Sequence, residues 1–158
     1  MPVVLLQRPS PNYNSRDGSD IDCIVLHADA APKIAQSIDW LRDPESKVSY
    51  HVIIGRLGDC YQLVDFDDRA WHAGKSVFQG VSDVNDYSIG VCFGNRQDGV
   101  ERFTEAQYQV GAELCRELCD RYLITTDRIT THQAIAPTRK SDPGRFFDLP
   151  YFLELVSK

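Results

Sequence analysis

Short apolar runs alternate with amphipathic stretches along this chain, a pattern typical of a sheet packed against helices. Residues 21–27 form a mostly apolar run without a helical period, which predicts a central strand covered on both faces. Residues 49–55 and 60–64 are two further apolar runs separated by the turn sequence R-L-G-D, which predicts a β-hairpin. Further strands are expected at 87–93 and 128–131.

Three segments have the periodicity of helices. The strongest runs to about Tyr122 and opens with the capping-box sequence T-E-A-Q, in which a threonine is followed three residues later by glutamine. Residues 35–41 form a shorter amphipathic helix that stops before Pro44, because proline disfavours helix in the residue before it. A short closing helix is expected near Phe152 and Val156.

The remaining segments define the organisation of the chain. Residues 1–20 are expected to form an extended arm, because 7–20 are polar and rich in turn formers and should lie on the surface. Residues 67–86 are irregular, and a long loop inside a compact domain is usually functional. No repeat or linker divides residues 1–158. We therefore predict one α/β domain, a central mixed β-sheet flanked by helices, with a site at one edge of the sheet.

Composition narrows the classes of partner. The net charge is −6 and lysine and arginine form no cluster, which argues against nucleic acid. No stretch approaches the roughly 18 consecutive apolar residues of a membrane span. The five cysteines lack paired spacing and residues 1–9 do not resemble a signal peptide, so we expect reduced thiols and a cytoplasmic location.

The segment 132–144 is the densest in candidate chemistry. It holds His132, Lys140 and Asp142, and its two prolines argue against a continuous helix, so we expect a strand end running into a shaped loop. Such a loop can bring the histidine near the carboxylate. With His27, at the end of the first strand, three ligands would leave one position open, as a catalytic zinc ion requires. Spacing alone leaves structural, hydrogen-bonded histidines equally open.

Five sequence blocks stand out along the chain. They are I-V-L-H (24–27), S-Y-H (49–51), R-A-W-H-A-G (69–74), N-D-Y-S-I-G (85–90) and H-x4-P-x-R-K-S-D-P-G (132–144). Taken together, they resemble the zinc-dependent N-acetylmuramoyl-L-alanine amidases, a family that includes the AmpD and AmiD amidases, many phage endolysins and the peptidoglycan recognition proteins. The resemblance extends over nearly the whole chain and implies that fold.

The resemblance also implies residue roles. It makes His27, His132 and Asp142 the ligands of a zinc cofactor, Lys140 the catalytic lysine, and Tyr50 a second catalytic residue. It implies that the loop at 71–74 binds substrate through Trp71, His72, Ala73 and Gly74. His51 alternates with Tyr50 along its strand, so we expect it to point to the opposite face and to be structural.

The chemistry of these residue types agrees with the implied roles. Zinc held by two imidazoles and a carboxylate activates water, and the Lys140 ammonium would stabilise the oxyanion formed on the amide carbonyl. One position departs from the AmpD-like pattern, because Cys92 stands where that branch has a glutamate base. A thiol of ordinary pKa is a poor substitute. Tyr50, another carboxylate or the zinc hydroxide itself remain candidates for the base.

We therefore predict a zinc amidase that cuts between N-acetylmuramic acid and L-alanine in peptidoglycan or muropeptides, and we expect a monomer. One alternative is a non-catalytic peptidoglycan-binding module on the same fold, and another is a zinc hydrolase of a different amide. The biological setting is open between a phage endolysin released through a holin, a bacterial lytic enzyme, and a cytosolic amidase that recycles muropeptides.

Overall fold

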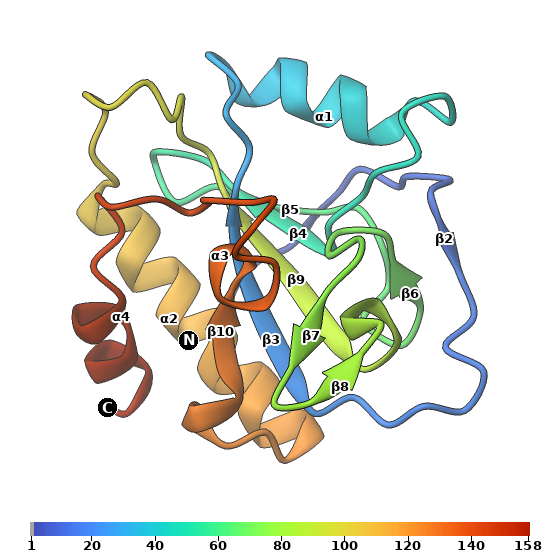
Figure 1. Cartoon of the computed structure of the whole chain (residues 1–158). Helices are drawn as coiled ribbons and strands as arrows, with labels where there is room; N and C mark the ends of the chain where they lie inside the picture. The colour runs from blue at the N-terminus through green and yellow to red at the C-terminus, as the bar shows by residue number, and fades with distance from the viewer. Residues whose placement is uncertain (1) are drawn as a thin grey trace.

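The run predicted as a central strand is an interior strand of a mixed sheet (Figure 1). The structure is a computed structural model that describes residues 2–158. Within that range the main sheet has the strand order β1-β5-β4-β9-β3-β10. Its strands are β1 (Leu6–Gln7), β3 (Cys23–Ala28), β4 (Val52–Ile54), β5 (Cys60–Gln62), β9 (Ser88–Phe93) and β10 (Ile129–Thr131).

The remaining elements surround this sheet. Two small two-stranded sheets pair β2 with β6 and β7 with β8. These elements are β2 (Tyr13–Asn14), β6 (Arg69–Ala70), β7 (Val77–Phe78), β8 (Val81–Ser82), the 3₁₀ turns η1 (Val84–Asp86) and η2 (Thr126–Arg128), and the helices α1 (Ile34–Arg42), α2 (Glu105–Tyr122), α3 (His132–Ile135) and α4 (Leu149–Val156). In the described chain, no helix combines the length and apolarity needed to span a membrane.

Strands β3 and β9 pair in parallel along their full length, and every residue of both is buried. β4 also runs parallel to β9, and β10 runs parallel to β3, whereas β5 is antiparallel to β4 and forms the predicted hairpin. Because parallel strands end at the same edge of a sheet, the end of β3 and the residues that follow β10 lie close together. His27 lies near the end of β3, and His132 directly follows β10.

The two faces of the sheet have different coverings. One face carries Ile24, Leu26 and Phe93, which pack in one core with side chains of α2 and α4. The capping box predicted for α2 is present, with Thr104 and Gln107 exchanging side-chain and backbone hydrogen bonds. The other face carries a smaller core under α1 and the residues around the 71–87 loop. His27 belongs to this second face, because it alternates with Leu26 along β3.

The N-terminal segment is extended, as predicted, but the expected surface position is wrong for part of it. β1 pairs with β5 and β2 pairs with β6, so the segment adds to two sheets. The side chains of Ser10, Asn12 and Arg16 are buried. Each of these side chains donates to a backbone carbonyl, Arg16 for example to Phe66 O, and polar composition therefore did not mean exposure here.

The segment after β10 also differs from its prediction. His132 begins a one-turn helix, α3, instead of a loop. Thr131 is its N-cap, and the threonine hydroxyl accepts from the backbone N–H of Ala134. The irregular loop begins after Ile135, near the first of the two prolines. The helical turn fixes the direction in which the His132 side chain leaves the backbone.

The packing of α2 on the sheet gives a first testable prediction, the substitution Gly111→Ala. An alanine Cβ would lie 2.6 Å from Cε1 of Phe93 and 3.2 Å from Cε2 of Phe152. Alanine gains about 1 kcal/mol of helix propensity over glycine, but overpacking a buried site costs about 1–3 kcal/mol. We expect urea unfolding to show a net loss of stability. The exposed Gln109→Ala should stay within about 0.5 kcal/mol of wild type, and an equally stable Gly111→Ala would contradict the packing.

Candidate active site

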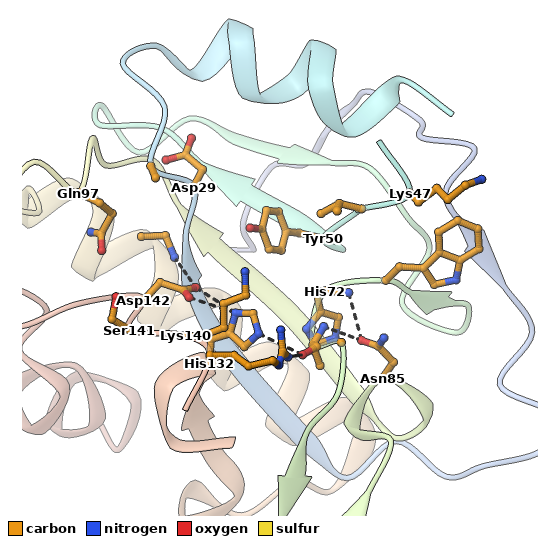
Figure 2. Close-up of a pocket in the computed structure, with 17 residues that line it drawn as sticks. Asp29, Lys47, Tyr50, His72, Asn85, Gln97, His132, Lys140, Ser141 and Asp142 are labelled. Carbon is orange, nitrogen blue, oxygen red and sulfur yellow. Dashed lines mark hydrogen bonds and ion pairs between the residues drawn. The ribbon is translucent and has the colours of Figure 1, made fainter. Parts of the chain in front are cut away.

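A cavity of about 490 Å³ opens at the sheet edge where β3 ends, and it contains the predicted site residues (Figure 2). Its walls come from the segments after β3 and before β4, from the 71–74 loop and from the 132–142 segment. The predicted residues that line it are Tyr50, Trp71, His72, Ala73, Gly74, His132, Lys140 and Asp142. His27 is fully buried beneath the cavity floor, in contact with His132 and Asp142.

Three donor atoms converge at this floor. Nδ1 of His27 lies 3.1 Å from Nδ1 of His132 and 3.2 Å from Oδ2 of Asp142. Nδ1 of His132 lies 3.3 Å from the same carboxylate oxygen. Among the described residues, His27, His132 and Asp142 are the group of potential metal ligands whose donor atoms lie close enough together to hold one ion. We call them the metal-ligand group. Ligand bonds of about 2.0–2.1 Å at tetrahedral angles put ligand atoms roughly 3.3–3.4 Å apart, so the donors fit a tetrahedral metal ion such as zinc.

The far nitrogens of both imidazoles are also hydrogen-bonded. Nε2 of His132 lies 3.1 Å from the carbonyl oxygen of Ala73, to which it donates. Nε2 of His27 lies 2.9 Å from Nδ1 of His72. A metal bound at Nδ1 requires the hydrogen of each neutral ring to sit on Nε2, and both far contacts accept such a hydrogen.

Burial sets the protonation of the group. It lowers the pKa of His27 to about 4 and that of His72 well below its ordinary value, so both rings are neutral near pH 7. Burial opposes ionisation of Asp142, but its contacts with His132 and His27 outweigh burial and hold its pKa below the ordinary range. The neutral His27 ring and the ionised Asp142 carboxylate thus face the same point as Nδ1 of His132.

Tyr50 and Cys92 occupy the wall beside His27. The Tyr50 ring centroid lies 4.9 Å from that of His27, and Tyr50 packs against the hydrophobic cluster that contains Cys92. Burial raises the pKa of both groups well above their ordinary values. Tyr50 is therefore a hydrogen-bond donor near pH 7 and a poor proton acceptor. Cys92 is a neutral buried thiol, unsuited to be a nucleophile.

Lys140 and the 71–74 loop lie where the sequence places them, at the cavity. Lys140 is exposed and lines the cavity beside Asp142. Trp71 is half-buried, and its indole N–H donates to Asn14 Oδ1. His72 is buried and both its ring nitrogens contact the protein, one at His27 and the other at Ser88 Oγ. Substrate binding by this loop remains a prediction.

Sequence reasoning missed several cavity residues. Asp29 is not among the predicted site residues, but it lines the cavity, and its carboxylate accepts from Ser37 Oγ and from the Asn95 backbone N–H. Asn85 and Arg139 also line it. A signal existed for each: Asp29 lies two residues beyond His27 on the same side of the strand, and the other two stand inside the quoted motif blocks.

A family model described as N-acetylmuramoyl-L-alanine amidase matches residues 17–145. The chain belongs to this family. The predicted family and amidase activity are therefore confirmed.

Curated relatives align with most of this amidase. It is 38% identical over 170 residues to the 1,6-anhydro-N-acetylmuramyl-L-alanine amidase AmpD of Escherichia coli, covering 95% of this chain and 91% of that protein. The N-acetylmuramoyl-L-alanine amidase AmiD of the same organism is 34% identical over 141 residues, covering 80% of this chain and 50% of that one.

Solved structures confirm the predicted fold class. A selenomethionine derivative of AmpD superposes with a TM-score of 0.84 at 35% identity, over 96% of this amidase and 94% of that chain. AmiD of E. coli, in complex with the substrate anhydro-N-acetylmuramic acid-L-Ala-D-γ-Glu-L-Lys, superposes with a TM-score of 0.78 at 31% identity, over 90% of this amidase and 58% of that chain.

His51, which directly precedes β4, lies outside the metal-ligand group. It is fully buried, its Nδ1 accepts from the Gly90 backbone N–H at 3.0 Å, and its Nε2 donates to Asp68 O at 2.8 Å. Arg16 Nη2 lies 3.1 Å from the same Nε2. Burial, reinforced by the Arg16 charge, lowers the pKa of His51 from 6.5 to about 3.

This shift predicts a pH dependence of stability. Between pH 6.5 and 3 the unfolded chain binds a proton at His51 that the folded protein does not bind, so stability falls as pH falls, by about 1.4 kcal/mol per pH unit for one proton. We expect His51→Asn, which keeps an acceptor for Gly90 N–H, to have a shallower slope by about that amount. Urea unfolding with EDTA between pH 4 and 6 measures both slopes, and equal slopes would show that His51 does not titrate this way.

Proposed function

We propose that this protein is a zinc-dependent amidase of the AmpD type, which hydrolyses the amide between N-acetylmuramic acid and L-alanine in muropeptides. The observation that carries the proposal is the convergence of His27, His132 and Asp142 at ligand-to-ligand distances of 3.1–3.3 Å. The far nitrogen of each imidazole already has an acceptor. A non-catalytic binding module has no need of three metal donors arranged in this way.

Similarity to AmpD supports a 1,6-anhydro-muropeptide as substrate. The AmpD relatives are named for that substrate class and align over nearly the full length of both chains. A cytoplasmic recycling role agrees with the five free cysteines among the described residues, because unpaired thiols are typical of reducing compartments. We favour this setting over an endolysin, and we retain the expectation of a monomer.

Each side chain has a proposed task. A zinc ion at the three donors would supply Lewis-acid activation of the amide carbonyl and of the attacking water. The Lys140 ammonium stabilises the oxyanion that develops on the carbonyl oxygen, a contribution of about 3–4 kcal/mol for one such donor. Tyr50 keeps its proton and donates a hydrogen bond to the same oxygen or to the water. Trp71 and Gly74, at the cavity wall, contact the substrate.

The same geometry leaves fewer candidates for the general base. Cys92 is neutral and buried, and the raised pKa of Tyr50 keeps its phenol protonated near pH 7, so no phenolate is available as a base. Asp29 is a carboxylate on the cavity wall, but Ser37 and Asn95 hold its oxygens, which gives it a supporting role for the loop after β3. The reaction therefore depends less on a side-chain general base than it would with the glutamate of the AmpD-like pattern.

Product analysis tests the function directly. Purified protein is incubated with anhydro-muropeptides and, separately, with intact peptidoglycan, and the products are identified by mass spectrometry. We expect release of free stem peptides from the anhydro-muropeptides, abolished by EDTA and restored by zinc. Intact substrates at every zinc concentration would leave the binding module as the better assignment. Cleavage of a different amide would support a hydrolase of another specificity.

Variants separate metal binding from turnover. His132→Ala and Asp142→Ala each remove one of three ligands, so we expect loss of both bound zinc and activity. Lys140→Ala should retain zinc and lose about 10²–10³-fold in kcat, the typical effect of losing one oxyanion donor. Lys33→Ala, an exposed lysine outside this cavity, serves as the matched control. Elemental analysis and steady-state kinetics provide the readouts, and a wild-type rate for Lys140→Ala would exclude its oxyanion role.

A further inference from the structure

Two consecutive residues of the 71–74 loop contact the far sides of both metal-ligand imidazoles. Nδ1 of His72 lies 2.9 Å from Nε2 of His27, and the carbonyl oxygen of Ala73 lies 3.1 Å from Nε2 of His132. Both contacts are acceptors, and an imidazole that binds metal through Nδ1 must donate through Nε2. The loop is thus matched to the one tautomer in which each histidine can be a ligand.

His72 is itself fixed in the protonation and position that this role needs. Its Nε2 lies 3.0 Å from Ser88 Oγ, which accepts the ring hydrogen and leaves Nδ1 free to accept from His27. Gly90 leaves the space for the ring, because a Cβ at that position would lie 2.5 Å from Cγ of His72. Ser88 and Gly90, both in β9, therefore hold the His72 ring against His27.

The backbone of the loop is held by two further side chains. Oδ1 of the buried Asn85 accepts from the backbone N–H groups of both His72 and Ala73, at 3.1 and 2.8 Å. Nη2 of Arg139 donates to the carbonyls of Ala73 and Lys75, at 3.0 and 2.7 Å. The Ala73 oxygen thus receives both the Arg139 guanidinium and the His132 imidazole.

Arg139 also connects the loop to the segment that carries the third ligand. It lies three residues before Asp142, and its guanidinium passes so close to Gly74 that a Cβ there would lie 2.9 Å from Nη2. Gly74 has a positive φ of 60°. The glycine that closes the W-H-A-G motif thus leaves room for the arginine of the R-K-S-D motif.

We propose that the 71–74 loop positions the metal ligands, with His72 acting through His27 and Arg139 acting through the Ala73 carbonyl on His132. This inference rests on the proposed zinc function. It changes the assignment of His72 from a substrate contact to a positioning residue. It also gives Arg139, which had no assigned role, the same kind of task.

The first experiment compares two substitutions of His72. His72→Asn keeps an acceptor oxygen near the place of Nδ1, whereas His72→Leu removes it. We expect His72→Leu to bind zinc 10- to 100-fold more weakly in competition with a chelating dye, the usual effect of losing such a partner, and His72→Asn to recover most of that loss. The visible spectrum of the cobalt-loaded protein should change in His72→Leu and stay close to wild type in His72→Asn.

The second experiment tests Arg139 independently. Arg139→Met removes both donated bonds, and we expect a 10- to 100-fold loss of zinc affinity with an altered cobalt spectrum. Arg139→Lys should recover part of the loss. Arg116→Met is the matched control, because Arg116 also donates to a backbone carbonyl, that of Leu155, far from the ligands. It should lower stability without changing metal affinity.

The outcomes separate this inference from the proposed function. If the wild type binds no zinc and cleaves no muropeptide, the proposed function fails. If the wild type does both, and His72→Leu and Arg139→Met bind zinc like wild type but raise KM, the loop contacts substrate and the positioning role is overturned. If His72→Leu or Arg139→Met fails to fold, His72→Asn and Arg139→Lys decide. Metal affinity close to wild type in His72→Asn, together with a partial loss in Arg139→Lys, supports the inference. Any other combination contradicts it.

Discussion

The parallel pairing of β3 with β9 is the constraint on which the site depends. Its register sets His27 beside Cys92 and places the end of β3 next to the residue that follows β10. A shift of one residue would turn His27 into the core beneath α2 and bring Leu26 to the site face. Six consecutive buried residues on each strand make that shift costly, because apolar and polar side chains would exchange faces. The hydrophobic core thus specifies the ligand geometry.

Much of this arrangement was predictable from the sequence, for identifiable reasons. The apolar runs marked the strands because buried parallel strands carry few polar residues, and the capping box marked the start of α2. The three candidate ligands were singled out because their motif spacing resembles that of a known family, and the structure brings their donor atoms together. The one-turn helix at His132 was missed because four residues are too few to show a helical period, and its signal was only the Thr131 cap.

The hydrogen-bond partners of the ligands were beyond reach of the sequence. The acceptor for His132 is a backbone carbonyl, which any residue at position 73 would supply. Burial of Arg16 and Asn12 was missed for a related reason, since their partners are backbone carbonyls brought together only by the fold. Family resemblance gave the 71–74 loop a role toward substrate, whereas two of its side-chain and backbone contacts are with the imidazoles of His27 and His132.

The thiol at Cys92 has an electrostatic consequence. A glutamate there would add a buried negative charge beside His27, whereas the neutral thiol leaves a cavity lined by the cations Lys47, Arg139 and Lys140 and the carboxylates Asp29 and Asp142. Any bound divalent cation adds to this local excess of positive charge on a chain of net charge −6. Field lines concentrate in such a hollow and draw small anions toward it. The missing acid thus makes the cavity more attractive to anionic groups than the acidic chain as a whole.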